Sequence, residues 1–361
     1  MRSLLGLAML IWFSSESLAK RPRPTEVVPV EVVTPDPTPP PPPTYPLPQR
    51  DLHAPTALGP LPNGLASASA QGCGACHTDV TRAWRGSAHA QPPTQDHLEM
   101  AQRRADPSCT TCHLPLQRQH PSEQWSPTLA SEAVTCVTCH VDDGRVLVSA
   151  LSEQSPHTDG LAPDLKTDGA CTTCHEYTKP GMSVPLYDTV SSWRASPYAA
   201  AGIGCQDCHT HAGAEGHGLP LSLHEALTAL VEMNQPALVR GKDNQTVQLT
   251  LQNTGAGHTI PSGSPWSGLE LGIVLQNGDR TRVTLPWTTM LAREVDATDT
   301  ISGDNRLHPG ETKTFTIPVD LDVRKPAGRW RLSVEAWHVV NGTRVAAAGP
   351  EWTHTVQIHV E

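Results

Sequence analysis

The chain of 361 residues has almost no phenylalanine, few lysines and no cysteine outside one repeated motif. With only two phenylalanines, large aromatic side chains can supply little of a conventional core. The six lysines and the formal net charge of −10 argue against a partner that is nucleic acid or an anionic membrane. Beyond the N-terminus no apolar run is long enough to span a bilayer, so we expect no transmembrane segment after signal removal.

The first 19 residues have the pattern of a secretory signal peptide. Arg2 supplies the charged start, residues 4–13 form a short apolar run, and Ser17-Leu18-Ala19 offers a small-x-small cleavage site. No cysteine lies directly after the apolar run, so we expect no lipoprotein anchor. We therefore predict an exported protein, with the periplasm favoured and the cell surface as the alternative.

Residues 20–63 are dominated by proline, with an unbroken run at 39–43. Proline favours the polyproline II conformation and leaves no core to bury, so we predict a semi-rigid linker. A ligand for a proline-binding partner is the alternative interpretation.

The sequence Cys-x-x-Cys-His occurs five times, and these copies hold all ten cysteines. The motif is the attachment sequence for c-type haem: two thiols form thioethers with one porphyrin, and the adjoining histidine lies under the ring as the proximal iron ligand. A lone Cys-x-x-Cys also fits a zinc site, a redox dithiol or a disulfide, but histidine follows every pair here and paired zinc sites would leave one unit over. We therefore predict five covalently attached c-type haems. The residues of motifs 1 to 5 are, in order, Cys73, Cys76 and His77; Cys109, Cys112 and His113; Cys136, Cys139 and His140; Cys171, Cys174 and His175; Cys205, Cys208 and His209.

The chain divides into two regions with different patterns. Residues 64–233 have little amphipathic periodicity, as expected where porphyrins supply the core, and we predict a pentahaem cytochrome c domain of short helices and loops. Helices are expected over 79–88 and 222–233. Residues 234–361 alternate apolar and polar residues between turn signals, which predicts an all-β, immunoglobulin-like sandwich. Expected strands lie at 247–251, 269–275, 315–319, 330–336 and 356–360, with turns at 277–279, 309–310 and 341–342.

Three stretches within residues 70–265 resemble multihaem c cytochromes related to the tetrahaem electron carrier of nitrifying bacteria and to the haem core of hydroxylamine oxidoreductase. They are WRGSAHA at 84–90, SPYA at 196–199 ahead of motif 5, and residues 216–263, which resemble a subgroup with an appended C-terminal β-domain and a G-H-x-x-P loop. The resemblance implies that distal iron ligands come from these segments.

Each iron needs a sixth ligand or keeps an open coordination position. We predict His89, His120, His157, His217 and His258 as distal ligands; the alternative for each is a surface or propionate-bonded histidine. Because His258 lies in the β part, its ligation would clamp the two regions together. Less favoured candidates are His97, His211, His224, Met100 and Met182.

Residues 193–199 (WRASPYA) repeat 84–90 position by position, with Tyr198 in the place of His89. We interpret Tyr198 as a packing or propionate-bonding group. A tyrosine beside an open iron would instead indicate a substrate-handling site.

These features predict an exported pentahaem cytochrome that carries electrons between redox partner proteins through closely packed, mostly bis-histidine haems. The acidic net charge favours partners with a basic docking surface. The alternative is a reductase or oxidase of a small nitrogen or sulfur oxyanion at one five-coordinate haem. A third interpretation makes the β-domain a docking module.

Overall fold

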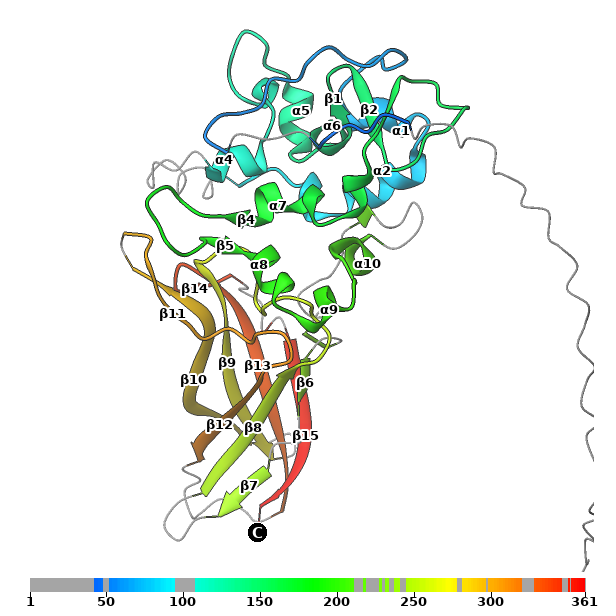
Figure 1. The fold of residues 1–361 in the computed structure, drawn as a ribbon. Helices are drawn as coiled ribbons and strands as arrows, with labels where there is room; N and C mark the ends of the chain where they lie inside the picture. The colour runs from blue at the N-terminus through cyan, green and yellow to red at the C-terminus, as the bar shows by residue number, and fades with distance from the viewer. Residues whose placement is uncertain are drawn as a thin grey trace, which may run out of the picture. The chain divides into compact units, whose positions relative to one another are not determined.

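The computed structural model describes residues 42–47, 52–94, 108–210, 217–218, 227–228, 231–233, 237–240, 245–277, 281–296, 298–319, 328–345, 350 and 352–360. The predicted signal peptide at 1–19 lies outside these residues, and so does the linker up to residue 41. Below, "motif region" denotes the described residues up to 210, and "β region" those from 231 onward (Figure 1).

The motif region is built from short helices that contain or adjoin the Cys-x-x-Cys-His motifs. Motif 1 begins in α1 and ends in the turn before α2, whereas motifs 2 to 5 lie in α4, α6, α7 and α10. One helical turn brings the two thiols and the histidine of each motif close together. The helices are α1 (Ala70–Gly74), α2 (Thr78–Arg85), η1 (Ala88–Ala90), α4 (Ser108–His113), η2 (Gln117–Gln119), α5 (Pro127–Glu132), α6 (Cys136–His140), η3 (Pro163–Lys166), α7 (Gly169–His175), α8 (Thr189–Arg194), α9 (Pro197–Ala200) and α10 (Cys205–His209).

Short strands pin the loops between these helices. They are β1 (Val141–Asp142), β2 (Arg145–Val148) and β3 (Asp159–Leu161) in one sheet, and β4 (Glu176–Tyr177) with β5 (Tyr187–Asp188) in another. The apolar core here is small, as the pattern predicts: its buried members are Ala68, Leu116, Leu129, Val137 and Val141.

Part of the predicted linker contacts the motif region. The amide of Tyr45 donates to the carbonyl of Leu161 at 2.7 Å, and the guanidinium of Arg145 lies 4.7 Å from the centre of the Tyr45 ring. Further along, Leu58 and Leu61 pack against the small core. An extended proline-rich backbone exposes its remaining amides and carbonyls, and here the motif region supplies partners for them.

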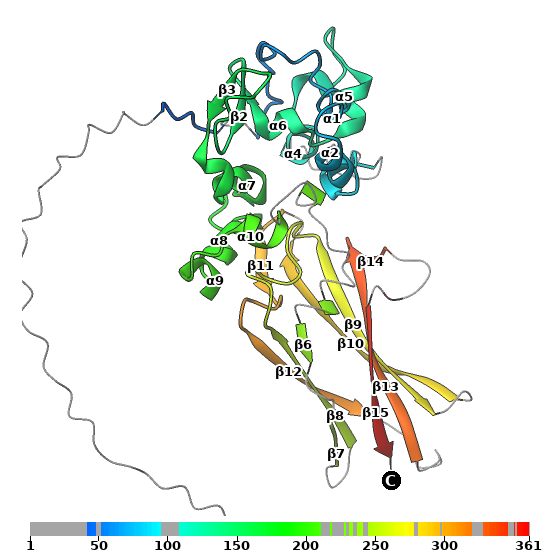
Figure 2. The same cartoon turned by 90° about the vertical axis from the view of Figure 1, so that its right-hand side faces the viewer.

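The β region contains two antiparallel sheets, which Figure 2 shows as two layers. The six-stranded sheet has the order β11-β10-β9-β13-β14, with β15 also paired to β13; the four-stranded sheet has the order β12-β8-β6, with β7 also paired to β8. The strands are β6 (Val231–Met233), β7 (Ala237–Arg240), β8 (Gln245–Asn253), β9 (Ser267–Asn277), β10 (Thr281–Val295), β11 (Ile301–Asp304), β12 (Thr312–Val319), β13 (Gly328–Val340), β14 (Thr343–Arg344) and β15 (Trp352–Val360).

Both sheets contribute to one apolar core. Leu249 from β8, Ile273 from β9 and Trp330 from β13 are fully buried within it. All five predicted strands are present, and Asn341 and Gly342 both have positive φ, as the turn of a tight hairpin between β13 and β14 requires. Strand β10 was not predicted. The two sheets are open, and this arrangement does not establish the immunoglobulin-like class.

The β region begins earlier than the predicted boundary at residue 234. Strand β6 pairs with β8, so the predicted helix over 222–233 is wrong at its C-terminal end. Residues 227 and 228 are helical, as predicted, and Leu227 is buried in the core of the β region. The apolar repeat therefore identified the helix but did not show that strand β6 begins by residue 231.

Candidate haem sites

Within the part of the chain that the structure describes, three motif histidines lie opposite a second imidazole from a distant part of the chain. His175 of motif 4 faces His89, with ring centroids 6.2 Å apart and planes at 47°. His140 of motif 3 faces His217 at 6.2 Å and 33°. The fifth motif forms the third pair, described next.

His209 of motif 5 faces His258 with ring centroids 6.1 Å apart and planes only 12° from parallel. A metal–imidazole bond is about 2 Å long, so two imidazoles on opposite sides of one metal have centres roughly 6 Å apart. The three pairs therefore fit an axial pair of ligands to a haem iron.

Hydrogen bonds at Nδ1 orient two of these rings. Nδ1 of His140 lies 3.0 Å from the carbonyl oxygen of Leu147, and Nδ1 of His258 lies 3.1 Å from that of Thr259. A bond from Nδ1–H to a carbonyl fixes the tautomer in which Nε2 is the ligating nitrogen.

The paired histidines are in environments that favour neutral imidazole. Burial, with neighbouring histidines adding to it, lowers the pKa of His175 to about 4. Burial also lowers the pKa of His89, His140, His217 and His258. Only the neutral ring has a lone pair for a metal, so these sites are prepared for ligation at neutral pH.

Three of the predicted distal ligands, His89, His217 and His258, are thus each placed beside a motif histidine. They come from the η1 segment, from a short described stretch after motif 5, and from the loop between β8 and β9. Their ligation of iron stays a prediction that this geometry supports.

The other two predicted distal ligands have different surroundings. Nδ1 of His157 lies 2.7 Å from Oδ1 of Asp159, an orientation in which Nε2 would be the ligating nitrogen. His120 turns Nε2 toward the carbonyl oxygen of Leu114 at 2.7 Å. That contact would leave Nδ1 as the nitrogen that His120 offers to an iron, and its ligation stays a prediction.

The cysteines show how the motifs lie relative to one another. The side chains of Cys73 and Cys136 lie close to each other. Those of Cys171 and Cys205 are likewise neighbours. Motif 1 therefore contacts motif 3, and motif 4 contacts motif 5.

The arrangement of the cysteines does not resemble zinc sites or disulfides. None of the ten cysteines is in a disulfide bond. Among the described residues, no three His, Cys, Asp or Glu side chains gather into a group that could hold a metal ion. Tetrahedral zinc needs about four such ligands. The donor set fits the covalent attachment of haem instead.

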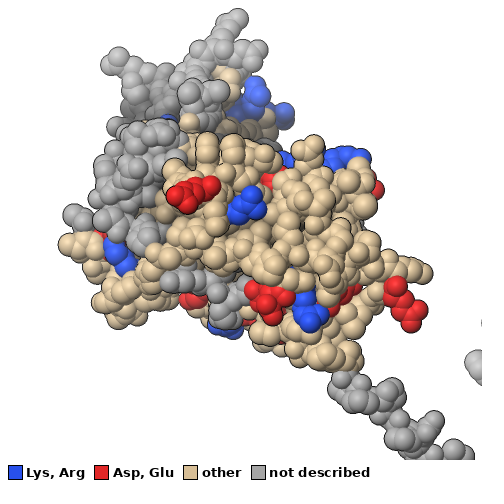
Figure 3. All heavy atoms as spheres, turned by 90° about the horizontal axis from the view of Figure 1, so that it is seen from above, with Lys and Arg blue, Asp and Glu red and all other residues tan. Residues whose placement is uncertain are grey.

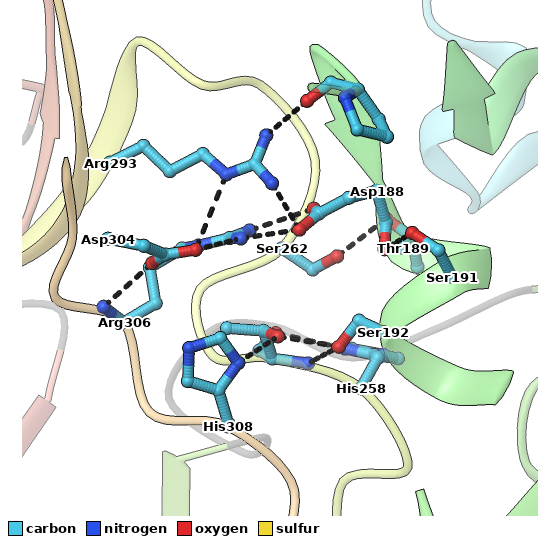
Figure 4. A network of polar contacts seen from close by, with 12 residues as sticks. Asp188, Thr189, Ser191, Ser192, His258, Ser262, Arg293, Asp304, Arg306 and His308 are labelled. Atoms are coloured by element: carbon cyan, nitrogen blue, oxygen red, sulfur yellow. Dashed lines mark hydrogen bonds and ion pairs between the residues drawn. The ribbon is translucent and has the colours of Figure 1, made fainter. Parts of the chain in front are cut away.

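A buried ion-pair cluster joins the motif region to the β region (Figure 4). Asp188, at the end of β5, accepts hydrogen bonds from both Arg293 and Arg306, and Asp304 pairs with Arg306 at 2.6 Å. The side chains of the two arginines are only 5% and 4% exposed. Buried pairs of this kind depend on every partner being present.

Hydroxyl groups add a second set of contacts between the regions. The hydroxyls of Ser192 and Thr259 lie 2.5 Å apart, and those of Thr189 and Ser262 lie 2.6 Å apart. The Tyr198 hydroxyl donates to the carbonyl of Thr254 at 2.8 Å. Tyr198 is therefore a packing group at the contact between regions, in keeping with the first of the two interpretations.

Comparison with known proteins agrees with this geometry. Residues 72–141 match the family model of cytochrome c554 and c-prime. The crystal structure of a penta-heme cytochrome c552 from Thermochromatium tepidum has a similar fold, with a TM-score of 0.59 and 19% sequence identity over 82% of this chain and 98% of that chain. The chain has the fold of a multihaem c-type cytochrome, and binding of c-type haem is supported.

Two further structures share only partial similarity. They are the alkylpurine DNA glycosylase AlkC from Pseudomonas fluorescens (TM-score 0.18, 14% identity, 38% of this chain and 34% of that chain) and beta-glucosidase 3B from Thermotoga neapolitana (TM-score 0.17, 16% identity, 35% and 15%). TM-scores this low do not indicate a shared fold. No curated protein sequence matches the chain significantly. Within the described residues, no helix has the length and apolar character needed to cross a membrane.

Proposed function

We propose that the chain is an exported pentahaem c-type cytochrome that carries electrons between redox partner proteins through mostly bis-histidine haems. The observation that carries the proposal is the set of three imidazole pairs with centroids 6.1 to 6.2 Å apart. When bound, c-type haem supplies an iron that accepts and releases one electron. An imidazole on each side of that position would leave no room there for a substrate.

The contacts between motifs support a continuous route. Motif 1 contacts motif 3 through Cys73 and Cys136, and motif 4 contacts motif 5 through Cys171 and Cys205. Cys139 of motif 3 also lies near Cys171 of motif 4. Motifs 1, 3, 4 and 5 are therefore each close to another motif, as a route for electrons requires.

Motif 2 lies beside motif 4. The ring of His113 acts electrostatically on His89 and on His175, in both cases less strongly than burial. Motif 2 therefore lies close to the His89–His175 pair of motif 4.

The sequence feature that suggested an enzyme, Tyr198, has a different role in the structure. Tyr198, which a substrate site beside an open iron would use, donates its hydroxyl to Thr254 in the β region. The proposed function needs no acid or base catalyst, and the ring pairs leave none of their imidazoles available for such a role.

The partner is proposed to be another redox protein. On the face drawn in Figure 3, acidic and basic side chains are interspersed, and neither sign forms a continuous patch. The proposal that the partner has a basic docking surface therefore rests on the net charge of −10. Export, with the periplasm as the favoured compartment, rests on the N-terminal sequence.

Mass spectrometry and a redox titration of the purified full chain test this function together. We expect a mass increase of five haems, and reversible one-electron steps over a wide range of low potentials. The reduced protein should transfer electrons to an oxidised c-type cytochrome without turning over nitrite, hydroxylamine or sulfite. Steady turnover of any of these three compounds would favour the enzyme alternative.

A further inference from the structure

The sequence repeat between 84–90 and 193–199 is also a repeat of backbone structure. The C-cap residue of α2 is Gly86, with φ −80° and ψ −8°. The C-cap residue of α8 is Ala195, with nearly the same angles, φ −81° and ψ −3°. The next residue is extended in both copies, at φ −89° and ψ 162° for Ser87 and φ −89° and ψ 159° for Ser196. Both segments then turn into a short helix, so position 89 of the first copy corresponds to position 198 of the second.

The residue at this shared position has a different partner in each copy. In the first copy His89 faces the motif histidine His175. In the second copy Tyr198 reaches the β region and donates its hydroxyl to the carbonyl of Thr254 at 2.8 Å. Thr254 belongs to the loop that presents His258.

Other residues of the second copy contact the same loop. The hydroxyl of Ser192 accepts a hydrogen bond from the amide of Thr259 at 2.9 Å. Gly257 lies against the second copy: a Cβ atom there would be 3.3 Å from Cδ1 of Trp193 and 3.5 Å from Cβ of Tyr198. The residues on both sides of His258 in sequence are therefore held by the motif region.

The β region holds the opposite side of the loop. The side chain of Asn253 donates to the carbonyl of His258 at 3.0 Å and accepts from the amide of Ala256 at 3.0 Å. Asn253 is buried, with 1% of its surface exposed. The loop is thus fixed between Asn253 on one side and α8 and α9 on the other. Figure 4 shows Ser192 of α8 next to the part of the loop that contains His258.

We propose that Ser192 and Tyr198 are positioning residues for the distal ligand of motif 5. They hold the loop that carries His258 so that its ring stays nearly parallel to that of His209. In this proposal the second copy of the repeat has no iron ligand at the position of His89. Instead it holds the loop of the β region that carries the ligand His258. This proposal rests on the proposed bis-histidine function.

The test uses the haem-loaded full chain and the variants Tyr198→Phe, Ser192→Ala and both together. Tyr198→Phe keeps the ring against Gly257 and removes only the hydroxyl, so a folding defect is not expected. Low-temperature EPR, the midpoint potential and the rate of cyanide binding are measured. Ser333→Ala, which removes a hydroxyl pair between β13 and β15, is the matched control, and His258→Ala identifies the EPR signal that belongs to motif 5.

We expect the motif 5 signal to become heterogeneous and its midpoint potential to shift in the variants. Cyanide binding should accelerate roughly 5-fold for Tyr198→Phe and roughly 25-fold for the double variant, because each lost hydrogen bond favours the state with His258 dissociated. The control should match the wild type. If the double variant has full haem content and all three readouts are unchanged, the positioning role is wrong. A wild-type protein in which the motif 5 haem is already high-spin before cyanide is added would instead refute the proposed bis-histidine function.

Discussion

The rings of His209 and His258 are nearly parallel, 12° apart, and their centroids are separated by 6.1 Å. One ring belongs to a haem-attachment motif, and the other belongs to a loop between two strands of the β region. If an iron joins them, the β region becomes part of the redox centre as well as an appended domain.

Replacing His258 by Ala should convert one low-spin haem to high-spin, because the iron of motif 5 loses its sixth ligand. Absorption and EPR spectroscopy of the oxidised protein measure this change. His338→Ala, a histidine in β13 outside the three ring pairs, is the control and should have the wild-type spectrum. An unchanged spectrum of His258→Ala would show that His258 is not a ligand.

The three ring pairs should have different EPR signals. Parallel imidazoles interact with the same iron d orbital and split the d levels strongly, whereas tilted imidazoles split them less. The pair at 12° should therefore give the most rhombic signal and the pair at 47° the least rhombic one. His89→Ala should remove the least rhombic of the three and His258→Ala the most rhombic. The reverse assignment would contradict the ring geometry.

Replacing Arg306 by Met should destabilise the protein more than any surface ion-pair variant. Arg306 bonds to both Asp188 and Asp304 with its side chain 4% exposed, and its removal leaves Arg293 as the one cation of the cluster for two largely buried carboxylates. Such changes cost about 3–5 kcal/mol. Arg344→Met is the control, since its pair with Glu270 is at the surface and is worth about 0–1 kcal/mol. Chemical denaturation of the haem-loaded protein compares the two, and equal losses would contradict the structural role.

The contact between the two regions should weaken in acid. Burial raises the pKa of Asp304, but the hydrogen bond and charge of Arg306 outweigh it, and the net result is a lowered pKa. A carboxylate with a lowered pKa adds stability above its ordinary pKa of about 3.9 and loses that stability as the pH falls through the folded value. The difference in melting temperature between wild type and Asp304→Asn should thus be largest near neutral pH, should begin to shrink at about pH 4 and should disappear only below the lowered pKa of folded Asp304. A difference that grows in acid would mean that the ion pair is not the cause.

Sequence patterns identified the parts of this protein in which local spacing decides the chemistry. Each Cys-x-x-Cys-His motif is contained in five consecutive residues, and the alternation in β8, β9, β12, β13 and β15 follows directly from burial of one face. The candidate ligands His89, His217 and His258 came from segments that resemble a known family, because nothing in their local sequence distinguishes them from the other histidines.

Patterns failed where the interaction joins distant residues. Asp188, Arg293 and Arg306 form the buried cluster between the regions, yet each is an ordinary charged residue in its own segment. The proline-rich stretch around Tyr45 was assigned to a linker since polyproline composition does not reveal whether a neighbour will bind it. The repeat at 193–199 was visible, but the new partner of Tyr198 lies in the β region and could be identified only in three dimensions.

Low-temperature EPR of the oxidised protein, recorded before and after adding cyanide and nitrite, tests the central claim most directly. The account predicts low-spin signals for the haems of motifs 3, 4 and 5, unchanged by either compound, because two imidazoles occupy both axial positions of each iron. A high-spin signal from one of these three that shifts on addition of cyanide or nitrite would contradict the bis-histidine assignment and would favour a ligand-binding enzyme.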